Sequence, residues 1–193
     1  ADFTGVRARA YFATCRQVLA EIAPGKLYLG CRFATHNPRL VRIAAEYCDV
    51  LSFNIYRRTV AAWPVPGDVD RPVLIGEFHF GARDRGVFGD GLVGVENQAA
   101  RAAAVRRYLR DALEHPCFVG AHWFQYVDEP ATGRPLDGEN HQIGLVDICD
   151  TPHMETIAAF REVGAGLYGM RAAGQARPPA KEDRGREPPG AAR

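Results

Sequence analysis

The sequence predicts an α/β protein with a parallel sheet, and three observations lead to this prediction. Segments with helical periodicity alternate with short β-rich segments, so that an initial helix precedes four strand–connection units. The β-rich segments are nearly continuous apolar runs, which is typical of parallel strands that are covered on both faces. Polar and aromatic residues stand where these runs end, and α/β proteins bind their ligands at the carboxyl ends of parallel strands.

The first half of the chain contains two predicted helices and two predicted strands. Residues 5–22 have helical periodicity, with one apolar face formed by Val6, Ala10, Ala13, Val18 and Ile22. The run 27–33 (LYLGCRF) is the first predicted strand. Asn37 is an N-cap residue followed by proline, which begins a helix over residues 39–47. The run 49–56 (DVLSFNIY) is the second predicted strand.

The second half repeats this alternation. Residues 72–80 (PVLIGEFHF) and 118–126 (FVGAHWFQY) are the third and fourth predicted strands. Between them, residues 95–115 form an amphipathic helix whose inward face is predicted to hold Val95, Ala99, Ala102, Val105, Leu109 and Ala112. A last helix is predicted from Pro152 to about residue 163, because proline is favoured in the first turn.

The chain divides into an ordered body and a tail. Residues 172–193 contain Pro-Pro twice, several charges and no Val, Ile, Leu or aromatic residue, so we expect them to be disordered. The body, residues 1–171, is shorter than the roughly 250 residues of a typical closed (β/α)8 barrel. Its size is therefore that of part of a barrel.

Composition and motifs exclude several function classes. The net charge of +1 argues against nucleic acid or a membrane surface as the main partner, and no apolar run is long enough to span a bilayer. The sequence has no P-loop, no GxGxxG and no GxSxG motif. It also lacks HExxH and any close His or Cys spacing, so we predict no cofactor and no metal.

Glu77 is the sharpest candidate for a catalytic residue. It follows the apolar run 73–76, where an unpaired carboxylate costs free energy. One interpretation is a buried ion pair with Arg32, and the other is a nucleophile or general base at the end of a strand. In the second interpretation Arg32 and Tyr56 keep the carboxylate ionised, as a nucleophile requires.

Further substrate-binding candidates stand at the same strand ends and in the polar loop after the fourth strand. The indole of Trp123 is suited to packing against the C–H face of a sugar ring, although a tryptophan in a strand is also an ordinary core residue. The pair Asp137-Gly138 in this loop is typical of a turn, so part of the loop also has a purely structural interpretation. The remaining candidates are Asn54, His79, Gln125, Glu139 and Asn140.

These segments resemble the β-agarases of glycoside hydrolase family fifty, and more distantly the clan-A β-galactosidases. The resemblance covers roughly residues 12–169, and its most specific part is GAHWFQYVDEPATGR with DGENHQIGLVD. It implies the C-terminal half of a TIM (β/α)8 barrel, strands five to eight with their helices, and retaining hydrolysis of β-linked galactans such as agarose. It maps the nucleophile onto Glu77, the Tyr-bearing strand onto Asn54 and Tyr56, the sugar platform onto Trp123, and a substrate loop onto Glu139 and Asn140.

One element of the family pattern is missing. The family's acid/base stands in an Asn-Glu motif after strand four, and no such motif precedes Lys26. Retaining hydrolysis needs two carboxyl groups about 5–5.5 Å apart, so we expect the chain alone to be inactive and to require the N-terminal half barrel as partner. Relatives are secreted or periplasmic, whereas the five cysteines are compatible with the cytoplasm, so the compartment stays undetermined.

Two alternatives remain open from the sequence. The chain is also interpretable as a non-catalytic carbohydrate-binding half barrel that associates with a second copy, because a half barrel exposes two strand edges. A metal hydrolase of another barrel class is the second alternative, with a site assembled from His79, His122, Asp128 and His141.

Overall fold

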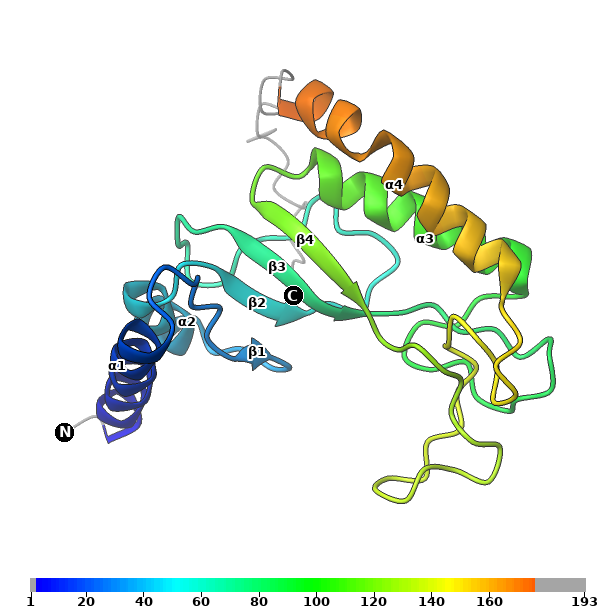
Figure 1. Ribbon diagram of the computed structural model, residues 1–193, viewed down its shortest axis with the longest axis horizontal. Helices are drawn as coiled ribbons and strands as arrows, with labels where there is room; N and C mark the ends of the chain where they lie inside the picture. Colours follow the sequence, from blue (N-terminus) through cyan, green and yellow to red (C-terminus); the bar gives the residue numbers. More distant parts are fainter. Residues whose placement is uncertain (1–2, 176–193) are drawn as a thin grey trace, which may run out of the picture.

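The computed structural model describes residues 3–175, which form a four-stranded parallel sheet flanked by helices (Figure 1). The strands lie in the order β1-β2-β3-β4. They are β1 (Arg32–Phe33), β2 (Leu51–Asn54), β3 (Val73–Phe78) and β4 (Phe118–Trp123). The helices are α1 (Phe3–Ile22), α2 (Pro38–Tyr47), α3 (Gln98–Glu114) and α4 (Met154–Gln175). Figure 1 shows α1 and α2 at the β1 end of the sheet, with α3 and α4 side by side at the β4 end.

The predicted fold class is confirmed. Each strand is parallel to the strand that follows it in the chain, which is the arrangement of consecutive strands in a (β/α)8 barrel. The first strand is much shorter than the predicted range 27–33. In residues 27–31 the ladder is replaced by contacts of Tyr28, whose N–H donates to Asp49 Oδ2 (2.7 Å) and whose carbonyl accepts from Asp49 N (2.9 Å).

Both α2 and α3 begin directly after an asparagine cap, of which only Asn37 was predicted. The Asn37 side chain accepts a hydrogen bond from Arg39 N (2.9 Å), and Pro38 is the first residue of α2. The Asn97 side chain accepts from Ala100 N (2.9 Å), so α3 begins at Gln98, three residues later than the amphipathic pattern predicts.

The apolar face predicted for α1 is not the face that packs. Phe12 is buried, and the partly buried side chains beside it are Ala8, Cys15 and Leu19. Val6 and Ile22 are instead 62% and 78% exposed. Apolar residues occur all round this helix, so periodicity alone selected the wrong side, and its packing against α2 decides the buried one.

A large part of the core lies between the sheet and α3, and residues of α1 and α2 extend it. Phe78 of β3 stacks on Tyr108 with a centroid distance of 4.4 Å, and the Tyr108 hydroxyl donates to Ile55 O (2.7 Å). Ala102, Val105 and Ala112 face inward as predicted, whereas Ala99 is exposed and the polar Arg101 is fully buried. The buried polar residue on α3 was not predicted from the periodicity.

The last helix extends beyond its predicted end. α4 continues to Gln175, so the predicted start of the tail at residue 172 falls inside a helix. The rest of the predicted tail, residues 176–193, lies outside the described residues. Within residues 3–175 the helices are too short or too polar to cross a membrane.

Candidate active site

Three neighbouring strands bring together the residues that the sequence predicts around Glu77. Glu77 Oε2 accepts a hydrogen bond from the Tyr56 hydroxyl (2.8 Å), which follows β2. Glu77 Oε1 lies 3.2 Å from Nη1 of Arg32 in β1, and the Glu77 side chain is 18% exposed. The carboxylate is thus held by one hydroxyl and one cation while part of it stays accessible.

Gly76 explains how Arg32 reaches this carboxylate. A Cβ on Gly76 would lie 2.6 Å from Arg32 Cδ and 2.6 Å from Ser52 Oγ, closer than such atoms approach. Arg32 Nη1 also donates to Gly76 O (3.0 Å). Glycine before Glu77 therefore leaves the space in which the Arg32 side chain crosses the strand.

Two buried oxygens beside this group have no hydrogen-bond partner among the described residues. Asn54 is in register with Glu77, and its Oδ1 is buried and unpaired. Ser52 Oγ, two residues earlier in β2, is also buried and unpaired. An unpaired buried acceptor costs about 1–3 kcal/mol, so these two oxygens are a local cost in this part of the sheet.

Tyr56 is held as a donor. Burial, followed by its hydrogen bond to Glu77, raises the pKa of Tyr56 well above its usual range, and the charge of Glu139 adds to this effect. Its ring packs on the imidazole of His79 with a centroid distance of 4.6 Å. The phenol therefore keeps its proton and donates a hydrogen bond to the Glu77 carboxylate.

The structure gives His79 a different place from the predicted one. His79 is 3% exposed, so it does not face a substrate. Its Nε2 accepts a hydrogen bond from Leu92 N (2.8 Å). Nδ1 therefore carries the proton and donates a hydrogen bond to Phe124 O (3.1 Å). Burial lowers the pKa of His79 to about 4. His79 is a neutral link between β3, the loop at residue 92 and the end of β4.

This burial predicts a pH dependence of stability. Below its ordinary pKa of 6.5, His79 takes up a proton in the unfolded chain, whereas the folded chain takes it up only near pH 4. We expect His79 to remove about 3 kcal/mol of unfolding free energy as the pH falls from 7 to 4. Urea unfolding of the wild type and of His79→Gln at both pH values measures this. An equal pH dependence in the two proteins would contradict the prediction.

Trp123 does not join the group around Glu77. Side chains alternate between the faces of a strand, and Trp123 lies on the face of Phe78, against which its ring packs edge-on at 5.2 Å. Phe160 of α4 lies 5.4 Å away on the same face, and Trp123 Nε1 donates to Ile143 O (2.9 Å). The partly buried indole packs against the core between the sheet and the helices, which favours the core interpretation over the sugar platform.

The next residue, Phe124, supplies an aromatic ring on the other face. Its ring centroid is 6.2 Å from that of His79, which packs on Tyr56. Phe124 was not among the predicted site residues, although the alternation in His122-Trp123-Phe124 was a usable signal. Directly after β4, Phe124 supplies the aromatic ring that lies beside His79.

The other predicted residues belong to the loop after β4. Gln125 Nε2 donates to Val127 O (3.1 Å), so this side chain turns into its own loop and is not brought to Glu77. Asn140 O accepts from Gly89 N (3.0 Å), which joins the loop to the segment after β3. Glu139 Oε2 lies 2.7 Å from Arg134 Nη2.

The metal site considered from the sequence, with His79, His122, Asp128 and His141 as ligands, does not form. Both ring nitrogens of His79 have partners, and Asp128 accepts from Gly144 N (2.6 Å) and contacts His153 Nε2 (2.8 Å). Within residues 3–175 a different group, Glu129, Glu139 and His141, places its ligand atoms within 4.8 Å of one another. The guanidinium of Arg134 contacts both of those carboxylates and supplies the positive charge there.

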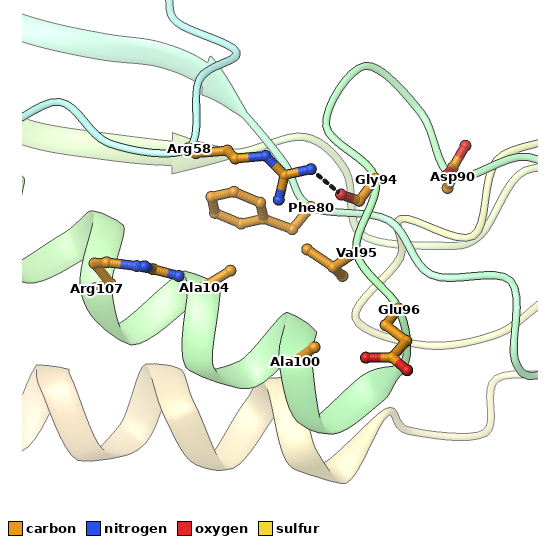
Figure 2. Close-up of a pocket in the computed structure, with 9 residues that line it drawn as sticks. All are labelled: Arg58, Phe80, Asp90, Gly94, Val95, Glu96, Ala100, Ala104 and Arg107. Atoms are coloured by element: carbon orange, nitrogen blue, oxygen red, sulfur yellow. Dashed lines mark hydrogen bonds between the residues drawn. The ribbon is translucent and has the colours of Figure 1, made fainter.

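A separate cavity lies beside α3, away from this group. It has a volume of about 420 Å³ and is lined by residues that follow β2 and β3 and by one side of α3. Figure 2 shows Arg58 and Arg107 at its rim, with the Arg58 guanidinium donating to Gly94 O (2.9 Å). None of the predicted site residues lines it, so the group around Glu77 is the candidate active site.

Sequence comparison relates the chain to agar-degrading enzymes. It is 41% identical to β-agarase B of Vibrio sp. (strain JT0107) over 166 residues, which are 83% of this chain and 17% of that protein. It is 44% identical to β-agarase A of the same organism over 168 residues, again 17% of that protein. The chain therefore spans about one sixth of the length of these relatives. No family model matches it.

Comparison of structures leads to the same group. The chain is similar to a solved exo-β-agarase, with 40% identity and a TM-score of 0.82 over 86% of this chain and 23% of that one. It is equally similar to the agarase AgWH50C, with 44% identity and a TM-score of 0.82 over 86% and 26% of the two chains. A β-galacturonidase from Eisenbergiella tayi, 18% identical with a TM-score of 0.53, shares the fold alone. By sequence and by structure, this chain is similar to one segment of these β-agarases.

Proposed function

We propose that this chain carries the nucleophile side of a retaining glycoside hydrolase that acts on β-linked galactans such as agarose. The observation that carries the proposal is the Glu77 carboxylate, held between the Tyr56 hydroxyl and the Arg32 guanidinium at the carboxyl end of β3. The chain is also 44% identical to a segment of β-agarase A, which its name describes as an agar-degrading enzyme.

In this proposal Glu77 attacks the anomeric carbon of the sugar. A bond forms from a Glu77 carboxylate oxygen to that carbon while the bond to the leaving glycosidic oxygen breaks, and a second carboxyl group gives its proton to that oxygen. Water then attacks the same carbon, releases Glu77 and gives its proton to the second group. Tyr56 and Arg32 stabilise the ionised nucleophile and orient it.

The second carboxyl group comes, in this proposal, from the other half of a complete barrel. The outer edges of β1 and β4 have no strand partner among residues 3–175, and these edges are where further strands of a barrel would pair. The chain by itself then binds sugar weakly and does not hydrolyse agarose, because both carboxyl groups must flank one glycosidic bond.

The same unpaired edges favour a second candidate function. A carbohydrate-binding half barrel that associates with another copy of itself would also cover both edges. Sedimentation analysis of the chain separates the two candidates, since a concentration-dependent dimer that binds galactan without hydrolysing it supports the binding module.

A chimera tests the enzymatic proposal. Residues 3–175 of this chain replace the matching segment of β-agarase A, to which they are 44% identical over 168 residues. We expect the chimera to hydrolyse agarose with retention of anomeric configuration and the isolated chain to be inactive. NMR of the first product measures its anomeric configuration. A folded chimera without activity, or one that inverts the configuration, would refute the proposal.

A further inference from the structure

We propose that Arg134 is a positioning residue that fixes Glu139 and Phe124 relative to Glu77 and thereby sets the affinity for the sugar. This inference rests on the proposed function, because it concerns the substrate-facing groups of the same site. It extends that proposal to a residue outside the strand ends, in the loop after β4.

The guanidinium of Arg134 holds three carboxylates of its loop at once. Its Nε and Nη2 donate to the two oxygens of Asp137, both at 2.7 Å. Nη2 also lies 2.7 Å from Glu139 Oε2, and Nη1 lies 3.2 Å from Glu129 Oε1. Only a planar fork of donors makes contacts in so many directions, and a lysine ammonium does not.

One of these carboxylates anchors the group in the protein interior. The Glu129 side chain is 1% exposed, and its Oε2 accepts from His141 N (2.8 Å). Glu129 N also donates to His141 O (3.0 Å), so the two ends of the loop meet at this pair. A buried carboxylate needs a cation close by, and the contact with Glu129 therefore fixes where the Arg134 guanidinium lies.

From this position Arg134 reaches the aromatic side of the site. Its Cζ lies 5.9 Å from the ring centroid of Phe124, over the ring. The Phe124 carbonyl accepts from His79, and the His79 ring packs on Tyr56, which donates to Glu77. Arg134 is thus joined to the nucleophile through packed rings.

Backbone hydrogen bonds also join residues 138 and 139 of the loop to Arg134. Arg134 N donates to Glu139 O (2.9 Å), and Gly138 N donates to Arg134 O (2.9 Å). A Cβ on Gly133 would lie 2.7 Å from Gly138 O, so this turn closes tightly only with glycine. The charge of Glu139 also adds to the rise in the pKa of Tyr56. Arg134 therefore contacts both Glu139 and the Phe124 ring, and we infer that it fixes the two relative to each other.

The first experiment measures agaro-oligosaccharide binding to the full chain by calorimetry, with Arg134→Gln, Arg134→Lys and Arg110→Gln as variants. Arg110 is the matched control, because it lies on α3 and forms an exposed ion pair with Glu162 of α4. We expect about tenfold weaker binding for Arg134→Gln, a smaller loss for Arg134→Lys, and no change for Arg110→Gln. Unchanged affinity in Arg134→Gln would overturn the inference.

A double-mutant cycle separates positioning from a general loss of structure. If Arg134 acts through Glu139, the double variant Arg134→Gln/Glu139→Gln binds no more weakly than Arg134→Gln alone. If Arg134 serves stability only, the two losses add, and the inference fails.

Hydrogen exchange distinguishes failure of this inference from failure of the proposed function. We expect faster amide exchange in residues 129–142 of Arg134→Gln and not of Arg110→Gln. Wild-type chain that binds no oligosaccharide would count against the proposed function, and the exchange result would then decide by itself whether Arg134 orders the loop. Unaltered exchange in Arg134→Gln would refute the positioning role.

Discussion

Glu77→Gln in the chimera with β-agarase A is expected to lower kcat on agarose by about 10⁴-fold or more, since removal of a catalytic nucleophile has effects of this order. The amide keeps the shape of the side chain and an oxygen that accepts from Tyr56, whose hydroxyl is 2.8 Å from the carboxylate. It cannot form the glycosyl-enzyme bond, because a neutral amide is a poor nucleophile. The dissociation constant for agaro-oligosaccharides should stay within about threefold of the parent value. Initial rates of reducing-sugar release and calorimetry measure the two quantities.

Glu155→Gln is the matched control for this variant. Glu155 is also a carboxylate paired with an arginine, Arg85, but it stands at the start of α4 and outside the candidate site. The control should hydrolyse agarose at the rate of the unaltered chimera. Hydrolysis by Glu77→Gln at a rate close to that of the control would rule out Glu77 as the nucleophile.

Arg101→Leu is expected to lower the free energy of unfolding of the chain by about 3–5 kcal/mol. Arg101 is fully buried, and it donates to Phe80 O and to Gly144 O, each at 2.7 Å. The leucine side chain leaves both carbonyls buried and unpaired, at about 1–3 kcal/mol each. It also removes the guanidinium that lies 5.2 Å from the ring centroid of Trp123, over the ring. Urea denaturation at pH 7 measures the change.

Arg110→Leu provides the reference for Arg101→Leu on the same helix. Its ion pair with Glu162 is exposed, so we expect a loss of no more than about 1 kcal/mol. Burial lowers the pKa of Arg101 to about 10, which still leaves the guanidinium charged at pH 7. Equal losses in the two variants would show that the contacts of Arg101 with Phe80 and Gly144 do not hold the loops together.

Several features of this protein follow from local sequence. The alternation of apolar runs with helical segments predicted a parallel α/β sheet, and the cap at Asn37 marks the start of one helix. The isolated carboxylate in the run 73–78 indicated Glu77, and the polar ends of the neighbouring strands indicated Arg32 and Tyr56. These predictions rest on residue type and spacing, which a single sequence contains in full.

The other assignments depend on which segments meet in space. The side of α1 that is buried is set by its contact with α2, and Trp123 packs, partly buried, against the core because α3 and α4 cover that face of β4. The proton of His79 is placed by two backbone groups, at Leu92 and Phe124, that are far from it in the sequence.

The fold class and the group around Glu77 were predictable from one sequence, because a helix cap, apolar periodicity and a carboxylate in an apolar strand are local signals. Three contacts became visible only in the folded chain: the burial of His79 between Leu92 and Phe124, the packing of Phe124 beside His79, and the contacts of Arg134 with Phe124 and Glu139. The physical reason is that a side chain's burial and its hydrogen-bond partners depend on contacts between segments distant in the chain, and one sequence does not specify those contacts residue by residue.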